Sequence, residues 1–172
     1  MILSDKDIID EIKAGRIVFS PKIGKEQIGG ASVDLTLAPR FWKFKPSYEG
    51  KVIDLKRVHF SQSFDEIKAR SIVLHPGELC LAITREKIKL APDIMGNLEG
   101  RSRYARMGLA VHITSALVQP GSDNHQVLEV VNFAPFAVKL HAGMRISQVV
   151  FEYIRTPTSQ PYAKYGKIAR GQ

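Results

Sequence analysis

Cysteine is nearly absent from this sequence: Cys80 is the single cysteine among 172 residues. The sequence therefore excludes an intrachain disulfide and a zinc site built from several cysteines. Long apolar runs are missing as well, since none approaches the roughly 18 residues that a membrane-spanning helix needs. Residues 1–13, MILSDKDIIDEIK, lack the basic and then apolar pattern of a secretory signal peptide. We therefore expect a cytoplasmic protein with no membrane partner.

Acidic residues are too few to balance the basic ones. The chain has 17 Asp and Glu against 25 Lys and Arg, which gives a formal net charge of +8 and a pI near 9.7. Such an excess suits a polyanionic partner, for example nucleic acid, an acidic membrane surface or a polyphosphate ligand. Aromatic residues make up 8% of the chain, and among the basic residues only Tyr104, Tyr162 and Tyr165 could act as stacking platforms. This pattern disfavours nucleic acid as the partner.

The remaining composition is that of a globular protein, with 44% apolar and 24% charged residues. The length predicts a single domain over residues 1–172. Ser4 followed by acidic residues predicts the start of a short helix that buries Ile8 and Ile12 and ends near Gly15. Short apolar runs between turn residues then predict strands at 16–20, 31–37, 71–74, 79–84, 109–114, 126–133, 136–140 and 146–154. Many short strands indicate an all-β sandwich or barrel.

Glu129 is the most informative single residue of the sequence. It lies in the strand-like run QVLEVVNF at 126–133, where alternation places it on the same face as Val127 and Val131. Burial would raise the pKa of this carboxyl and a nearby arginine would lower it again, which is the adjustment that a general acid or base needs. The alternative interpretation is an edge strand that exposes Glu129 to solvent.

A second candidate segment is GRSRYARMG at 100–108, in which Arg101, Arg103 and Arg106 accompany Ser102 around one predicted helical turn, the one internal helix that the sequence indicates. Guanidinium groups bind phosphate oxygens in a forked geometry, so the segment suits a phosphate ligand. A solvent-exposed basic helix is the alternative.

Several common catalytic motifs are missing. The five histidines show no metal-ligand spacing, and no H-x-E followed by P-C-x-x-C is present, which excludes the usual zinc-dependent nucleobase deaminases. The sequence also contains no G-x-G-x-x-G, Walker or G-x-S-x-G motif.

The two candidate segments together resemble the dCTP deaminase family of the dUTPase-like superfamily. The matching motifs are GRSRYARMGL at 100–109, HIT at 112–114, PG at 120–121 and LE at 128–129. Upstream GASVDL at 30–35 and HPGE at 75–78, and downstream GMRISQ at 143–148, are also similar to family sequence. The resemblance covers nearly the whole chain.

This resemblance implies a mainly β fold, a distorted jelly-roll or β-barrel of the dUTPase-like type with a short N-terminal helix and one short internal helix. It implies a homotrimer with active sites at subunit interfaces. The implied reaction converts dCTP and water to dUTP and ammonia, which feeds dUMP and thymidylate synthesis. Mg²⁺ would be bound through the substrate triphosphate, with no zinc and no metal ligands from the protein.

By motif match, Glu129 is expected to take a proton from the water that attacks cytosine C4 and to deliver it toward the leaving amino group. Ser102 and Arg106 would position that water and stabilise charge, and the backbone around Ser115 would hold it from the other side. The full set of residues implied in nucleotide binding is Arg101, Ser102, Arg103, Tyr104, Ala105, Arg106, Ser115, Gln119, Val127, Leu128, Glu129, Gln148, Tyr162, Lys164 and Gln172.

Three features depart from the family pattern. Arg103 replaces a small hydroxyl residue, and Gln119 stands where relatives usually carry Asp. The turn GSDN at 121–124 lacks the aromatic residue and the glycine that follow the PG pair in relatives. In dUTPases and bifunctional enzymes the matching Asp assists hydrolysis between the α- and β-phosphates, which glutamine cannot do. We therefore expect release of dUTP, with a dUTPase, a bifunctional enzyme or a non-catalytic nucleotide sensor as alternatives.

Residues 155–172 form a C-terminal tail that contains four basic residues and no acid. One interpretation is a frayed basic tail, and the other is a lid that orders over an anionic ligand. Because the tail is shorter than in relatives, Gln172 could take the role of a tail glutamine.

Overall fold

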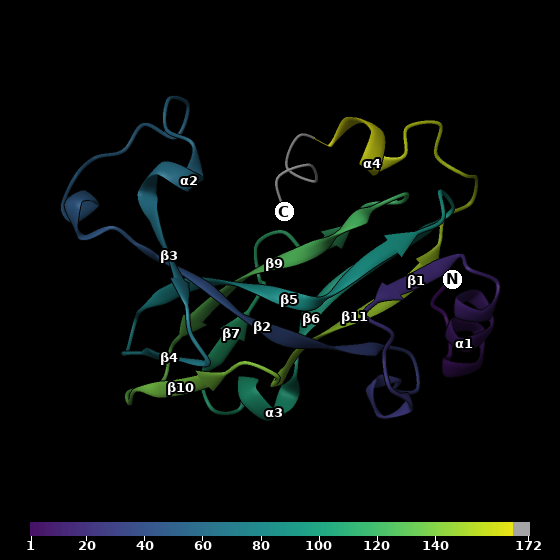
Figure 1. Ribbon diagram of the computed structural model, residues 1–172, viewed down its shortest axis with the longest axis horizontal. Coiled ribbons are helices and arrows are strands. Elements are labelled where there is room, and N and C mark those ends of the chain that lie inside the picture. The colour runs from purple at the N-terminus through teal and green to yellow at the C-terminus, as the bar shows by residue number, and fades with distance from the viewer. Residues whose placement is uncertain (167–172) are drawn as a thin grey trace.

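The computed structural model describes residues 1–166, and its centre is one strongly curled sheet (Figure 1). Within those residues the nine-stranded sheet has the order β7-β9-β5-β2-β11-β6-β8, with β1 paired to β5 and β3 paired to β2. A separate two-stranded sheet joins β10 to β4. The strands are β1 Ile17–Ser20, β2 Val33–Phe44, β3 Phe64–Lys68, β4 Ser71–Leu74, β5 Leu79–Leu90, β6 Ile94–Gly100, β7 Leu109–Val111, β8 Leu117–Val118, β9 Asp123–Asn132, β10 Val138–His141 and β11 Arg145–Tyr153.

The expected mainly β fold with few short helices is confirmed. Helix α1, Asp5–Lys13, begins after Ser4, whose Oγ accepts a hydrogen bond from the Asp7 backbone while the Asp7 carboxylate accepts one from Ser4. This reciprocal cap is the start predicted from the sequence. The other helical turns are η1 Lys25–Gln27, η2 Pro46–Tyr48, α2 Phe60–Ser63, α3 Ser102–Ala105 and α4 Tyr162–Tyr165. Of these, the sequence predicted α3.

Strand β2 shows why the alternation argument works. Val33, Leu35 and Leu37 are at most 1% exposed, whereas Asp34 and Thr36 lie on the opposite, half-buried face. Because side chains alternate across a strand, one face enters the core and the other becomes available for polar contacts. β2 is longer than predicted and continues to Phe44, where it pairs with β3.

Strand β6, which the sequence did not predict, pairs with β11 along most of its length. Gly96 interrupts its apolar pattern, but a Cβ at that position would lie 2.8 Å from the Val149 side chain. The glycine therefore permits close packing at a point where a larger residue would collide with β11.

The core lies inside the curl of the sheet and contains Phe41, Phe151 and the aliphatic residues of β2, β5, β9 and β11. Helix α1 covers one end through Ile8, which is fully buried. None of the helices in residues 1–166 is long and apolar enough to cross a membrane.

The described part of the tail, residues 155–166, packs on the body of the protein. The Thr158 N–H donates to the Pro92 carbonyl at 2.8 Å, and Tyr162 and Ala163 donate to Pro120 and Gly121, each at 3.0 Å. These backbone bonds fix α4 above the turn that precedes β9 (Figure 1). In this part the tail is therefore not frayed.

Candidate active site

Glu129 lies at the centre of β9, between strands β5 and β7. Its neighbours Leu128 and Val130 are fully buried in the core, whereas Val127, Glu129 and Val131 share the half-buried face, as alternation predicted. The Glu129 side chain retains 27% of its exposure. The carboxylate is thus sheltered by the sheet but can still reach a ligand.

His112 is the direct partner of Glu129. Its Nδ1 lies 3.1 Å from Glu129 Oε2, within ion-pair distance but outside good hydrogen-bond alignment. Its Nε2 lies 2.6 Å from the Ser115 carbonyl oxygen, and its backbone N–H donates to the Glu129 carbonyl at 2.7 Å. Because a carbonyl oxygen can only accept, the hydrogen of the contact with Ser115 is on Nε2.

The backbone of His112 is unusual, since its φ of +54° places it in the left-handed region. Histidine is one of the residues that enters this region more often than most. The conformation ends β7 and turns the imidazole ring toward β9. Local backbone geometry therefore aims His112 at Glu129.

The pKa of Glu129 is lowered from its ordinary value of 4.5. The contact with His112 is the main cause, burial opposes it, and the Thr114 side chain adds a smaller lowering effect. Within residues 1–166 the side chain with the largest lowering effect is this histidine, and not the arginine expected from the sequence. Glu129 is therefore ionised at neutral pH and ready to accept a proton.

Glu129 lines a cavity of about 570 Å³, here named the Glu129 cavity. Of the sequence-predicted residues, Ser115, Gln119, Val127 and Tyr162 also line it. Leu128 points into the core on the opposite face, so it presents only its backbone to this side of β9. Phe64 of β3, which the sequence did not single out, lines the cavity and stacks on Phe44 with ring centroids 4.2 Å apart.

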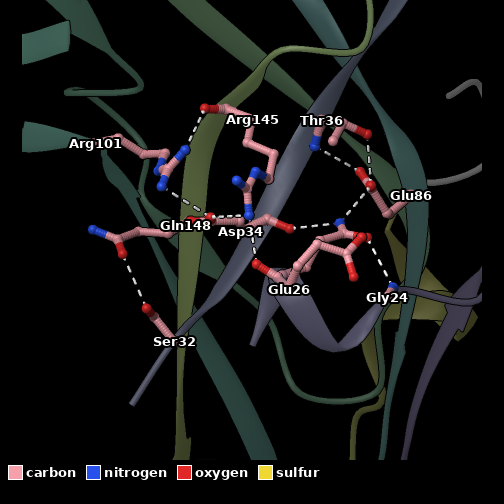
Figure 2. Close-up of polar contacts among 10 residues, drawn as sticks. Gly24, Glu26, Ser32, Asp34, Thr36, Glu86, Arg101, Arg145 and Gln148 are labelled. Carbon is pink, nitrogen blue, oxygen red and sulfur yellow. Dashed lines mark hydrogen bonds and ion pairs between the residues drawn. The ribbon is translucent and has the colours of Figure 1, made fainter. Parts of the chain in front are cut away.

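The arginine segment forms a second cavity of about 310 Å³, here named the arginine cavity. Arg101, Ser102, Arg103 and Gln148 line it, as expected for residues assigned to one ligand. Figure 2 shows Arg101 and Arg145 directed at Asp34 of β2, while the Gln148 amide points to Ser32. Asp34 belongs to the GASVDL motif, but the sequence alone gave it no role in the site.

Within residues 1–166, Tyr104 and Arg106 of the same segment do not line this cavity. Tyr104 is partly buried against the core, and the Arg103 guanidinium lies 5.9 Å from its ring centroid. Arg106 caps the carboxyl end of α3 and is exposed. The exposed side of α3 therefore presents Arg103 and Arg106 to solvent.

A third cavity of about 550 Å³, here named the bridging cavity, lies beside the other two. Ser102, Ala105, His112 and Gln148 line it. Ser102 thus lies on the arginine and bridging cavities, and His112 on the bridging and Glu129 cavities. Within residues 1–166, neither Ser102 nor Arg106 lines the Glu129 cavity itself.

The tail contributes Tyr162 to the Glu129 cavity, and Lys164 follows in the same helical turn. Gln172, the remaining tail residue predicted for the site, lies outside the described residues. In residues 1–166, no group of three His, Cys, Asp or Glu side chains could hold a metal ion.

The curled sheet and its arrangement of strands define the protein as one of the dUTPase-like fold. A solved 2'-deoxycytidine 5'-triphosphate deaminase from Agrobacterium tumefaciens superimposes with a TM-score of 0.70 at 19% identity, over 89% of this chain and 48% of that chain. The staphylococcal phage 80alpha dUTPase with dUPNHPP gives a TM-score of 0.52 at 14% identity, over 84% of this chain and 86% of that chain.

The family is narrower than the fold: the chain belongs to the dCTP deaminase-like family, whose model matches residues 2–154. A dUMP-forming dCTP deaminase of Methanosphaera stadtmanae is 38% identical over 94% of this chain and 83% of its own. The dCTP deaminase of Thermomicrobium roseum is also 38% identical, over 100% of this chain and 90% of its own. The resemblance inferred from the motifs is confirmed.

Proposed function

We propose that this protein is an enzyme that hydrolyses dCTP to dUTP and ammonia, with Mg²⁺ entering as part of the nucleotide. The observation that carries the proposal is the ionised Glu129 carboxylate, paired with His112 at the wall of a cavity that also holds Gln119 and Tyr162. A general base must be unprotonated before it can act, and the lowered pKa of Glu129 meets this requirement. The dUTP would supply dUMP for thymidylate synthesis.

In the proposed reaction, Glu129 takes a proton from water as the water oxygen bonds to cytosine C4. The C4–N4 bond then breaks, and Glu129 delivers a proton to the departing amino group, which leaves as ammonia. Ser102 and Arg106 position the water and stabilise charge, and the Ser115 carbonyl orients it from the other side. The Ser115 carbonyl oxygen also contacts His112 Nε2, so His112 links Ser115 to Glu129, the two groups on either side of the proposed water.

The proposed site is completed between copies of the chain in a homotrimer. This arrangement would explain why Ser102 lines a different cavity of one chain from Glu129, and why Arg106 does not line the Glu129 cavity within residues 1–166. It would also cover an apolar surface beside the bridging cavity, where Met107, Ile113 and Phe133 are 56%, 64% and 67% exposed. Large exposed apolar patches commonly mark protein interfaces.

The proposed product is dUTP because Gln119 lies on the Glu129 cavity and an amide cannot act as a base for phosphate hydrolysis. A dUMP-forming enzyme is the second candidate, which the names of two relatives favour. Incubation with dCTP and Mg²⁺, followed by separation of the nucleotides, distinguishes them. Ammonia with dUTP supports the proposal, whereas dUMP with pyrophosphate favours the second candidate.

Glu129→Gln tests the catalytic assignment, because it keeps the shape of the side chain and removes the base. We expect ammonia release to fall at least ~100-fold with dCTP binding retained, which is the usual contribution of a general base. Glu152→Gln on β11 is the matched control, since Glu152 pairs with Asn97 outside the Glu129 cavity. A wild type that binds dCTP and releases no ammonia would support the nucleotide sensor instead.

Mixing two inactive variants tests the shared site. If each site takes Glu129 from one copy and Arg106 from another, subunit exchange between Glu129→Gln and Arg106→Ala should restore about a quarter of wild-type activity. If both groups came from one copy, the mixture would stay inactive.

A further inference from the structure

Asp34 holds two arginines at the edge of the arginine cavity (Figure 2). Its Oδ2 lies 3.0 Å from Arg101 Nη2 and 3.4 Å from Arg145 Nη1. The Asp34 side chain is only 13% exposed, whereas Arg101 and Arg145 are 27% and 39% exposed. The buried carboxylate therefore lies behind the two more exposed guanidinium groups.

The Arg101 guanidinium is fixed at two points. One Nη contacts Asp34, and the other donates to the Arg145 carbonyl at 3.0 Å. The backbone is also held, because the Gln148 amide donates to the Gly100 carbonyl at 3.2 Å and accepts from the Ser32 hydroxyl at 2.9 Å. A guanidinium has five N–H donors, so contacts at two nitrogens leave donors for a ligand in the cavity.

Stability alone does not account for this arrangement. Burial raises the pKa of Asp34, and the attraction of Arg101 and Arg145 only partly offsets that effect. Buried ion pairs of this kind often contribute little to folding, because desolvation opposes the charge attraction. Within residues 1–166, the cavity is lined by Arg101, Arg103 and Arg145 against Asp34 and Glu26, so Asp34 also reduces the attraction for an anion.

We propose that Asp34 is a positioning residue, which fixes the Arg101 guanidinium in the orientation that binds the phosphate oxygens of the nucleotide. The proposal rests on the proposed function for the identity of the nucleotide. A purely electrostatic role and a positioning role of Asp34 predict opposite effects of Asp34→Asn on the binding of a polyphosphate. If Asp34 acted only through its charge, Asp34→Asn would strengthen the binding of a polyphosphate, since one negative charge would leave the cavity. If Asp34 orients Arg101, the same substitution weakens binding.

Inorganic tripolyphosphate is the first probe, because its binding does not depend on deamination. We expect Asp34→Asn to weaken its binding, measured by isothermal titration calorimetry, about tenfold, the usual effect of losing an oriented charged hydrogen bond. With dCTP the KM should rise by a similar factor while kcat changes less than about twofold, because the phosphates bind equally in ground and transition states. Unchanged or stronger binding overturns the proposal.

A double-mutant cycle tests whether Asp34 acts through Arg101. In an Arg101→Ala background, Asp34→Asn should cause no further weakening of tripolyphosphate binding. A second, independent tenfold loss would overturn the proposal. Asp93→Asn is the matched control, because it removes a carboxylate at 2.8 Å from Arg16, outside the arginine cavity, and should leave binding unchanged.

Asp34→Glu keeps the charge but displaces it by one methylene, and it decides the question if Asp34→Asn does not fold. Binding at least about threefold weaker than wild type supports positioning, and wild-type binding overturns it. The wild-type protein could release no ammonia from dCTP while the Asp34 substitutions still weaken tripolyphosphate binding as expected. That result would disprove the proposed function and leave the role of Asp34 intact.

Discussion

His112→Asn separates the imidazole ring from the backbone that carries it. Asparagine tolerates the left-handed conformation at φ +54°, so the turn after β7 should be kept. The shorter side chain cannot maintain both the 2.6 Å contact to the Ser115 carbonyl and the 3.1 Å contact to Glu129. The substitution therefore tests the ring contacts with little change in backbone strain.

The expected loss of unfolding free energy follows from those two contacts. The ring is 6% exposed, and removing a hydrogen bond to a charged group destabilises a protein by about 2 kcal/mol. In a domain of this size, such a loss lowers Tm by about 4–8 °C. His125→Asn on β9, the strand that carries Glu129, is the control, because His125 contacts the Thr84 carbonyl and not Glu129.

The pH dependence provides the sharper test. Glu129 has a folded-state pKa below its ordinary value of 4.5, so its contribution to stability is complete above that value and is lost as pH falls through the lowered pKa. Because His112 is the main cause of the lowering, the stability difference between wild type and His112→Asn should shrink on acidification from pH 7. The acid limb of the pH–rate profile should move to higher pH. A stability difference that stays constant during acidification, together with an unchanged acid limb, would refute the assignment of His112.

Two further predictions concern the tail and the thiol. Gly121 has φ +72°, and a Cβ there would lie 2.5 Å from Pro161 Cβ, so Gly121→Ala should release the tail and speed tryptic cleavage after Arg155. Gly143→Ala is the control, because Gly143 is also left-handed but has open space around it. Equal cleavage rates in the two variants would contradict the packing of the tail. Burial raises the pKa of Cys80 to about 12, so a thiol reagent at pH 8 should label it only when urea unfolds the protein, and rapid labelling of the folded protein would show the burial to be wrong.

The sequence was most informative where a pattern is local. The placement of Glu129 between two core-facing residues follows from the alternation of one strand, and the start of α1 follows from Ser4 and Asp7. Strand β6 escaped prediction because Gly96 and Gly100 dilute its apolar pattern. Its stability comes from pairing with β11, which a local pattern cannot reveal.

The contacts of the site depend on tertiary structure and were harder to predict. His112 matched a family motif, but its pairing with Glu129 requires both the left-handed turn and the register of β7 on β9. Asp34 lies within a predicted strand and a matching motif, yet its partners Arg101 and Arg145 come from segments far away in the chain. The catalytic and binding roles assigned to the site residues, those of Ser102, Arg106 and Gln172 among them, stay predictions.

The strict alternation of β9 also limits how this protein can change during evolution. Deleting one residue between Asp123 and Leu128 would rotate every later side chain of the strand to the opposite face. The acid would then enter the hydrocarbon interior, and aliphatic groups would replace it at the ligand. Substitutions can therefore accumulate along this strand, whereas insertions and deletions are confined to the loops at its two ends.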